Sequence, residues 1–155
     1  MEEGIKHPED FTGLLYDSLH LQPVSPGEFS PLALAYIGDA VYELIIRTKV
    51  INHGSVQVNK MHKKSAGLVK AETQADLIKV LEPQLTEEEH RIYKRGRNAK
   101  SGSMARNATM QDYRMATGFE ALVGYLYLAD QHARLFELVK DGLLLLGELE
   151  TGEET

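Results

Sequence analysis

The chain contains no cysteine. Disulfide bonds and thiolate metal sites are therefore excluded, which fits a reducing compartment such as the cytoplasm. No apolar run comes near the ~20 residues that a membrane-spanning helix needs. The charged start MEEGIKHPED also lacks the apolar stretch of a signal peptide. We therefore expect a cytoplasmic protein with no membrane partner.

Several catalytic signatures are missing as well. The six histidines show no metal-ligand spacing such as HExxH. There is no histidine-aspartate pair of the HD type and no glycine-rich phosphate loop, which counts against a phosphohydrolase of small nucleotides. No internal repeat and no alternating strand pattern of useful length occurs. The remaining pattern is helical and predicts an all-α protein with a single helical domain.

The charges are unevenly distributed along the chain. The net charge of −6 and a pI near 5.5 would by themselves argue against a nucleic-acid-binding protein. However, the stretches 44–71 and 91–106 each contain six Lys or Arg and no acid, and together they hold 12 of the 17 basic residues. Segregation of this kind can place a basic face on an acidic protein.

Capping and breaking residues divide the chain into helices. Ser30-Pro31 is a strong helix start, and Thr86 with Glu89 resembles a capping box. The expected helices cover residues 8–20, 31–51, a segment that begins after Ser55, 71–81, 86–96, 111–129 and 131–149. Residues 98–110 are polar and predict an exposed loop. We divide the chain into an N-terminal segment with a short helix (1–24), one catalytic domain (25–149) and an acidic tail (150–155).

Two apolar helices each contain one acid in an unfavourable place. Asp39 lies in LALAYIGDAVYELII beside Gly38, and Glu120 lies in MATGFEALVGYLYL between Gly118 and Gly124. A carboxylate among apolar residues is costly unless it is paired or bound to a metal, and a helical glycine costs roughly 1 kcal/mol relative to alanine. Both features make sense if the helices cross closely and the two acids meet at the edge of the crossing.

Such a pair could hold a divalent cation. Mg²⁺ accepts few protein carboxylates, keeps several waters and binds phosphate oxygens. The alternative interpretation is that each acid lies on the solvent edge of an amphipathic helix and has no chemical role.

The segments IGDAVYEL and TGFEALVGYLYL resemble the two core motifs of the ribonuclease III catalytic domain. Together with RGRNAK at 95–100 and YRMATGFEALVGYLYL at 113–128, they are most similar to Mini-ribonuclease III, the short form of that family without a double-stranded RNA-binding domain. The resemblance implies a ribonuclease III-type endonuclease domain in which Asp39 and Glu120 are the catalytic and metal-binding residues. The implied cofactor is Mg²⁺, with Mn²⁺ as a substitute.

The chain departs from full-length members of the family at three positions. Leu32 and Ala35 stand where that family usually carries acids upstream of the aspartate, and Thr117 stands where it carries an aspartate before the glutamate. The site therefore has fewer acidic residues than in full-length members, and the number of metal ions per site stays open.

The resemblance further implies hydrolysis of double-stranded RNA to 5′-phosphate and 3′-hydroxyl ends. Such an enzyme recognises A-form RNA by shape and charge. The basic stretches supply the candidate phosphate contacts, which are Lys60, Lys63, Lys64, Lys94, Arg95, Arg97, Lys100 and Arg106. The alternative for each of them is a solvated charged surface.

The resemblance also implies a homodimer, with an interface at Tyr36 and Ile37. The implied substrate is precursor 23S ribosomal RNA, matured during large-subunit assembly, and a ribosomal protein could present it. The competing hypothesis is a non-catalytic RNA-binding or ribosome-assembly protein on the same fold, although the presence of both Asp39 and Glu120 argues against it.

Overall fold

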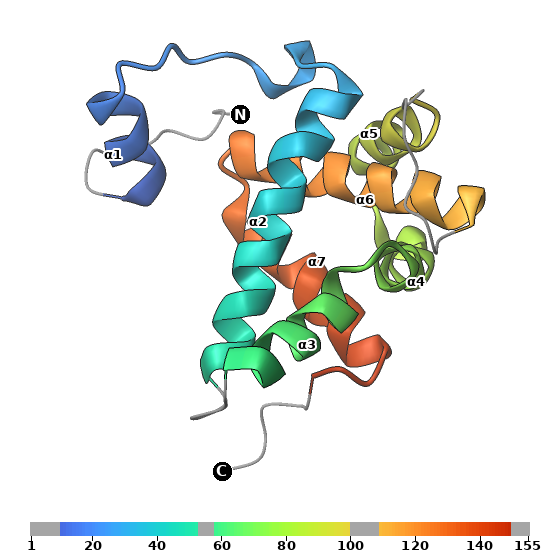
Figure 1. Ribbon diagram of the computed structural model, residues 1–155. Helices are drawn as coiled ribbons and strands as arrows, with labels where there is room; N and C mark the ends of the chain where they lie inside the picture. Colours follow the sequence, from blue (N-terminus) through green and yellow to red (C-terminus); the bar gives the residue numbers. More distant parts are fainter. Residues whose placement is uncertain (1–9, 53–57, 100–108, 150–155) are drawn as a thin grey trace.

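The computed structural model describes residues 10–52, 58–99 and 109–149, and every regular element in these ranges is a helix (Figure 1). This confirms the all-α prediction. None of the helices in the described ranges is both long and apolar enough to cross a membrane. The elements are α1 (Phe11–Ser18), η1 (Pro26–Glu28), α2 (Pro31–Asn52), α3 (Val58–Val69), α4 (Ala71–Leu81), η2 (Glu82–Gln84), α5 (Glu87–Arg97), α6 (Met110–Leu128) and α7 (His132–Leu145).

The predicted helix starts are confirmed where a cap determined them. The Ser30 hydroxyl accepts a hydrogen bond from the Ala33 amide (3.1 Å) at the start of α2. At the start of α5, the Thr86 hydroxyl accepts from the Glu89 amide and the Glu89 carboxylate accepts from the Thr86 amide. Each cap satisfies amide groups that have no partner within the helix, and so it fixes the residue at which the helix begins.

Helix α6 lies at the centre of the molecule. In Figure 1 it runs behind α2, with α5 above it and α4 and α7 below it. Its buried residues point to all sides, which explains why its sequence shows no single apolar stripe. Against α2, the rings of Phe119 and Tyr42 pack edge to face with 5.2 Å between their centroids, and the Tyr42 hydroxyl donates to the Leu68 carbonyl (2.9 Å). These contacts join α2, α3 and α6 in one core.

A buried ion pair fixes α5 to α7. Glu89 is almost fully buried, and both of its oxygens accept hydrogen bonds from Arg134 (2.8 and 2.9 Å). Arg134 also donates to the Gln84 carbonyl (2.9 Å) and to Glu137 (2.7 Å). Hydrogen bonds from Arg134 and Thr86 outweigh the effect of burial and lower the pKa of Glu89, so this carboxylate stays ionised.

Helix α1 lies at the side of the molecule in Figure 1, and its large side chains Phe11 and Leu14 are exposed. The buried residues are Thr12 and Gly13, and the Thr12 hydroxyl contacts the Asp130 carboxylate (3.3 Å). The contact between Thr12 and Asp130 joins α1 to the turn between α6 and α7.

Candidate active site

Helices α2 and α6 pack backbone to backbone where they cross. A Cβ atom added at Gly38 would lie 1.8 Å from the Glu120 carbonyl oxygen, and one added at Gly124 would lie 2.0 Å from the Leu34 carbonyl oxygen. No side chain fits at either position. The expectation that glycines let the two acid-bearing helices approach is therefore confirmed for Gly38 and Gly124.

Gly118 serves a different contact. A Cβ atom at this position would meet the ring and the backbone of Tyr93 on α5 at 2.6 to 2.7 Å. A Cβ atom at Gly96 of α5 would in turn lie 2.9 Å from the Gly118 Cα atom. Gly118 thus belongs to the α5–α6 crossing, and its assignment to the α2–α6 contact was wrong. The glycine-rich motif of α6 supports two close crossings rather than one.

The crossing brings Asp39 and Glu120 together. Asp39 lies on the exposed side of α2, whereas Glu120 is half-buried on α6. Burial, followed by the charge of Asp39 and a hydrogen bond between the two carboxyl groups, raises the pKa of Glu120 to about 8. At neutral pH, therefore, the Glu120 carboxyl group is mostly protonated. A cation that replaced this proton would be attracted by both carboxylates.

Gln74 is a third residue of the site, and it lies outside the two acid-bearing motifs that the sequence pointed to. Its side chain on α4 is 1% exposed. Its Nε2 donates to the Val69 carbonyl (2.7 Å), and a hydrogen bond from this side chain to Glu120 opposes the rise in the pKa of that carboxyl group. Its Oε1 atom has no hydrogen-bond partner among the described residues. One feature of the sequence could have identified Gln74. It is a polar residue on the apolar stripe of its helix, three positions before Leu77 and four before Ile78.

The site has few further acids. Ala35 is buried, and the Thr117 hydroxyl donates back to the Tyr113 carbonyl (3.0 Å) within α6. Glu43, one turn after Asp39, pairs with Arg47 at the surface (3.5 Å). Among the described residues, no three or more His, Cys, Asp or Glu gather closely enough to enclose a metal ion. Any ion at this place would keep most of its ligands as water or substrate oxygens.

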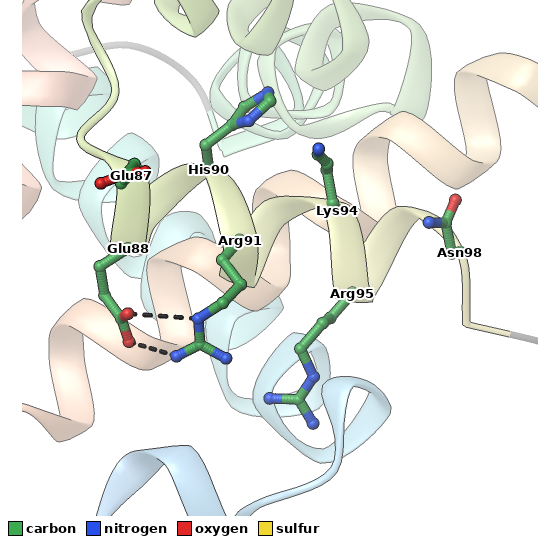
Figure 2. Close-up of a pocket in the computed structure, with 7 residues that line it drawn as sticks. All are labelled: Glu87, Glu88, His90, Arg91, Lys94, Arg95 and Asn98. Carbon is green, nitrogen blue, oxygen red and sulfur yellow. Dashed lines mark hydrogen bonds and ion pairs between the residues drawn. The ribbon is translucent and has the colours of Figure 1, made fainter.

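Basic residues are exposed on two helices, α3 and α5. Lys60, Lys63 and Lys64 are exposed on α3, which lies below α6 in Figure 1, while α5 lies above it. Lys94 and Arg95 of α5 line a shallow surface groove of 750 Å³ (Figure 2). Two further predicted contacts, Lys100 and Arg106, lie outside the described residues.

The remaining cations of α5 are engaged within the chain. Figure 2 shows the Arg91 guanidinium turned back onto the Glu88 carboxylate, which neutralises it. The Arg97 guanidinium lies over the Tyr93 ring, 5.4 Å from its centroid. Lys94 and Arg95, in contrast, form no ion pair with an acid in the described part of the chain. They are the cations of α5 that are best placed to meet an incoming anion.

The two residues expected at a dimer interface differ in exposure. Tyr36 is 83% exposed and is followed along the same face of α2 by the exposed Leu44 and Ile51. Ile37 is half-buried, and its Cγ2 lies 3.0 Å from the place where a Cβ atom at Gly124 would stand. Ile37 therefore packs within the chain, and Tyr36 carries the outward apolar surface.

A Ribonuclease III domain matches residues 32–131, a range that contains α2, the crossing and both acids. The chain belongs to the ribonuclease III family, and it is an endoribonuclease. Among its relatives is a Mini-ribonuclease 3 of Clostridium tetani, 53% identical over 73% of this chain and 76% of the relative. A Mini-ribonuclease 3 of Brevibacillus brevis is 46% identical over 78% of this chain and 90% of the relative. The predicted similarity to the Mini-ribonuclease III form is thereby confirmed.

A solved structure supports the same fold. A protein of Fusobacterium nucleatum, known from its crystal structure, superposes with a TM-score of 0.71. It is 31% identical to this chain and matches 79% of this chain and 96% of its own.

Proposed function

We propose that the chain hydrolyses double-stranded RNA as a homodimer, with a divalent metal ion held by Asp39 and Glu120. The observation that carries this proposal is the meeting of the two carboxyl groups at a glycine-mediated helix crossing, where burial and mutual repulsion raise the pKa of Glu120. Pairs of this kind are typical of functional sites because they cost stability without giving packing in return.

The residues present fit Mg²⁺, or Mn²⁺ in its place. Their donor atoms are carboxylate oxygens, which hard cations prefer, and a second acceptor, Gln74 Oε1, is buried nearby without a partner. One carboxylate is exposed and the other is half-buried, so the site has a side open to substrate. Few protein ligands are needed, because Mg²⁺ retains waters and takes phosphate oxygens from its substrate.

A bound divalent ion would polarise the phosphodiester and lower the pKa of a bound water. The chain itself contributes the two carboxylates of Asp39 and Glu120, held on two packed helices. The backbone contacts at Gly38 and Gly124 hold α2 and α6 together, and so they fix the separation of the two backbones that carry the carboxylates. Glu120 must lose its proton when the ion binds, and the proposed products are 5′-phosphate and 3′-hydroxyl ends.

Charge supports RNA as the substrate. Lysines are exposed on α3, and Lys94 and Arg95 of α5 form no ion pair with an acid in the described residues, so the net charge of −6 does not describe these two surfaces. Contacts to phosphates give affinity without base specificity, which suits an enzyme that recognises a duplex by its shape.

The apolar face of α2 supports the homodimer. Tyr36, Leu44 and Ile51 are all more than half exposed and lie on one side of the helix that carries Asp39. A two-fold axis at this face would pair two active sites, and a symmetric pair is what cutting both strands of a duplex requires. The proposed partner is therefore a second copy of this chain.

The proposed natural substrate is precursor 23S ribosomal RNA in the cytoplasm, with a ribosomal protein as an additional partner. This rests on the similarity to the Mini-ribonuclease III form. A chain without a separate RNA-binding domain in its described part depends on few phosphate contacts, and a substrate presented by another protein would compensate for that.

The test uses purified protein and two RNAs of equal length, one a duplex containing the precursor 23S stem and the other single-stranded. We expect cleavage of the duplex in the presence of Mg²⁺ or Mn²⁺, no cleavage with EDTA, and products that a 5′-phosphate-dependent exonuclease degrades. Equal cleavage of the single strand would contradict duplex specificity. Equal rates on an unrelated duplex would contradict the ribosomal substrate alone.

A further inference from the structure

We propose that Gln74 is a positioning residue of the metal site, which holds the Glu120 carboxylate with its amide N–H and offers its Oε1 atom to a water at the site. This inference rests on the proposed function, since it concerns the ion that Asp39 and Glu120 would bind. It assigns a role to a residue outside the two acid-bearing motifs.

The orientation of the Gln74 amide is determined by its surroundings. The group 2.7 Å from the Val69 carbonyl must be the NH₂ group, because a carbonyl oxygen only accepts hydrogen bonds. An amide NH₂ has two N–H donors, so the second remains for Glu120, and hydrogen bonding by this side chain lowers the pKa of that carboxyl group. Gln74 therefore donates to Glu120, an interaction that favours the ionised carboxylate, which is the form that binds a metal.

The Oε1 atom is then left as a buried acceptor. The side chain is 1% exposed, and the atom has no partner among the described residues. A buried acceptor of this kind is unfavourable unless a donor reaches it. Once Asp39 and Glu120 are both ionised they offer only acceptor atoms, so the donor that we propose for Oε1 is a water at the site. A water held between an ion and Gln74 Oε1 would satisfy the acceptor and fix the direction of that water.

The competing explanation is purely structural. Val69 is the last residue of α3, so the bond from Gln74 also closes the α3–α4 junction. However, Thr73 makes a parallel bond at the same junction, from its hydroxyl to the Gly67 carbonyl (2.7 Å), and no interaction of Thr73 with Glu120 accompanies it among the described residues. Replacing Gln74 and Thr73 one at a time therefore separates a role at the metal site from a role at the α3–α4 junction.

The test is a titration of the metal-free protein with Mn²⁺, followed by electron paramagnetic resonance, for the wild type and the variants Gln74→Met, Thr73→Ala and Glu120→Gln. Methionine matches the length of glutamine but neither donates to Glu120 nor accepts from water. Loss of a partner that orients a metal ligand typically weakens binding by 10- to 100-fold. We expect Gln74→Met to weaken Mn²⁺ binding by about tenfold and Thr73→Ala to leave it within about twofold of the wild type.

The outcomes distinguish this inference from the proposed function. Wild-type affinity in Gln74→Met overturns the role of Gln74 while Asp39 and Glu120 keep theirs, and so does an equal loss in Gln74→Met and Thr73→Ala. If Glu120→Gln binds Mn²⁺ as well as the wild type does, the proposed metal site fails and this inference fails with it. Should Gln74→Met not fold, Gln74→Asn takes its place, because its amide is one methylene too short to reach both partners.

Discussion

The backbone carbonyl of Glu120 lies directly against Gly38, where a Cβ atom would approach it to 1.8 Å. The crossing of α2 and α6 therefore has no space for any side chain at position 38. We expect Gly38→Ala to force α2 and α6 apart and to lower the free energy of unfolding by roughly 3 kcal/mol. A displacement of about 1 Å at a reacting group can lower the rate by ~100-fold. Cleavage should therefore fall by at least this factor, even at temperatures where the variant is folded.

Gly67→Ala is the matched control for this variant. Gly67 lies in helix α3, and a Cβ atom there would meet nothing within 4 Å. Because alanine is the better helix former, we expect a free energy of unfolding that is unchanged or higher by up to ~1 kcal/mol. Chemical denaturation of both variants measures the difference. Equal stability of Gly38→Ala and Gly67→Ala would show that the crossing is looser than we describe.

The stability of the metal-free protein should depend on the protonation of Glu120. Its pKa is about 8 in the folded chain and has an ordinary value of 4.5. Between these values the folded state binds a proton that the unfolded state has lost, so the free energy of unfolding falls as pH rises from about 4.5 to 8. The cause is burial together with the facing carboxyl group of Asp39, opposed by Gln74.

Urea denaturation in EDTA at several pH values measures this effect in the wild type and in Glu120→Gln. The variant has no titrating group at position 120, so its stability should fall less over the same range. Adding Mg²⁺ at pH 8 should restore stability to the wild type only. Parallel pH profiles for the two proteins would mean that Glu120 is an ordinary surface acid.

RNA affinity should depend on the free cations of α5. We expect the double variant Lys94→Ala/Arg95→Ala to bind an RNA duplex more weakly and to show a shallower dependence on salt, because each lost phosphate contact releases about one counterion fewer. Its melting temperature should stay nearly unchanged, since exposed charges contribute little to stability.

The control is Lys79→Ala/Lys140→Ala, which removes two exposed positive charges from α4 and α7 and so changes the net charge equally. Binding titrations at two salt concentrations compare the pairs. If both double variants lose the same affinity, RNA responds to the overall charge, and the groove on α5 is not a binding site.

The exposed apolar face of α2 should form the interface with a second copy. We expect Tyr36→Ser/Leu44→Ser to be a monomer in light scattering at micromolar concentration, whereas the wild type is a dimer. Phe136→Ser/Leu145→Ser is the control, because both of these residues are also more than half exposed but lie on α7. A dimeric Tyr36→Ser/Leu44→Ser variant would place the interface elsewhere.

The sequence predicted the helices well where local chemistry determines them. The cap at Ser30, the capping box at Thr86 and the range of α4 all agree with the structure, because a cap is an interaction between residues three positions apart. The face of α1 was not predictable in this way. Its burial depends on Thr12 meeting Asp130, a contact between residues distant in sequence.

The same limit applies to the active site. Two acids beside glycines in apolar helices predicted that Asp39 and Glu120 meet, and the structure places them together. Gln74 is carried by another helix, and only the packing of α4 against α6 brings it to Glu120. Gly118 looked equivalent to Gly124, but a sequence does not reveal which neighbour each side of a central helix meets.

We propose that metal-dependent cleavage needs the charges of Asp39 and Glu120. The most direct test is the cleavage rate of an RNA duplex in Mg²⁺ by the wild type, Asp39→Asn and Glu120→Gln, with circular dichroism and melting temperature recorded for each. The amides match the acids in size but are poor ligands for Mg²⁺. We expect both variants to fold as the wild type does and to show no measurable cleavage. Near-wild-type cleavage by either folded variant would contradict the account for that residue.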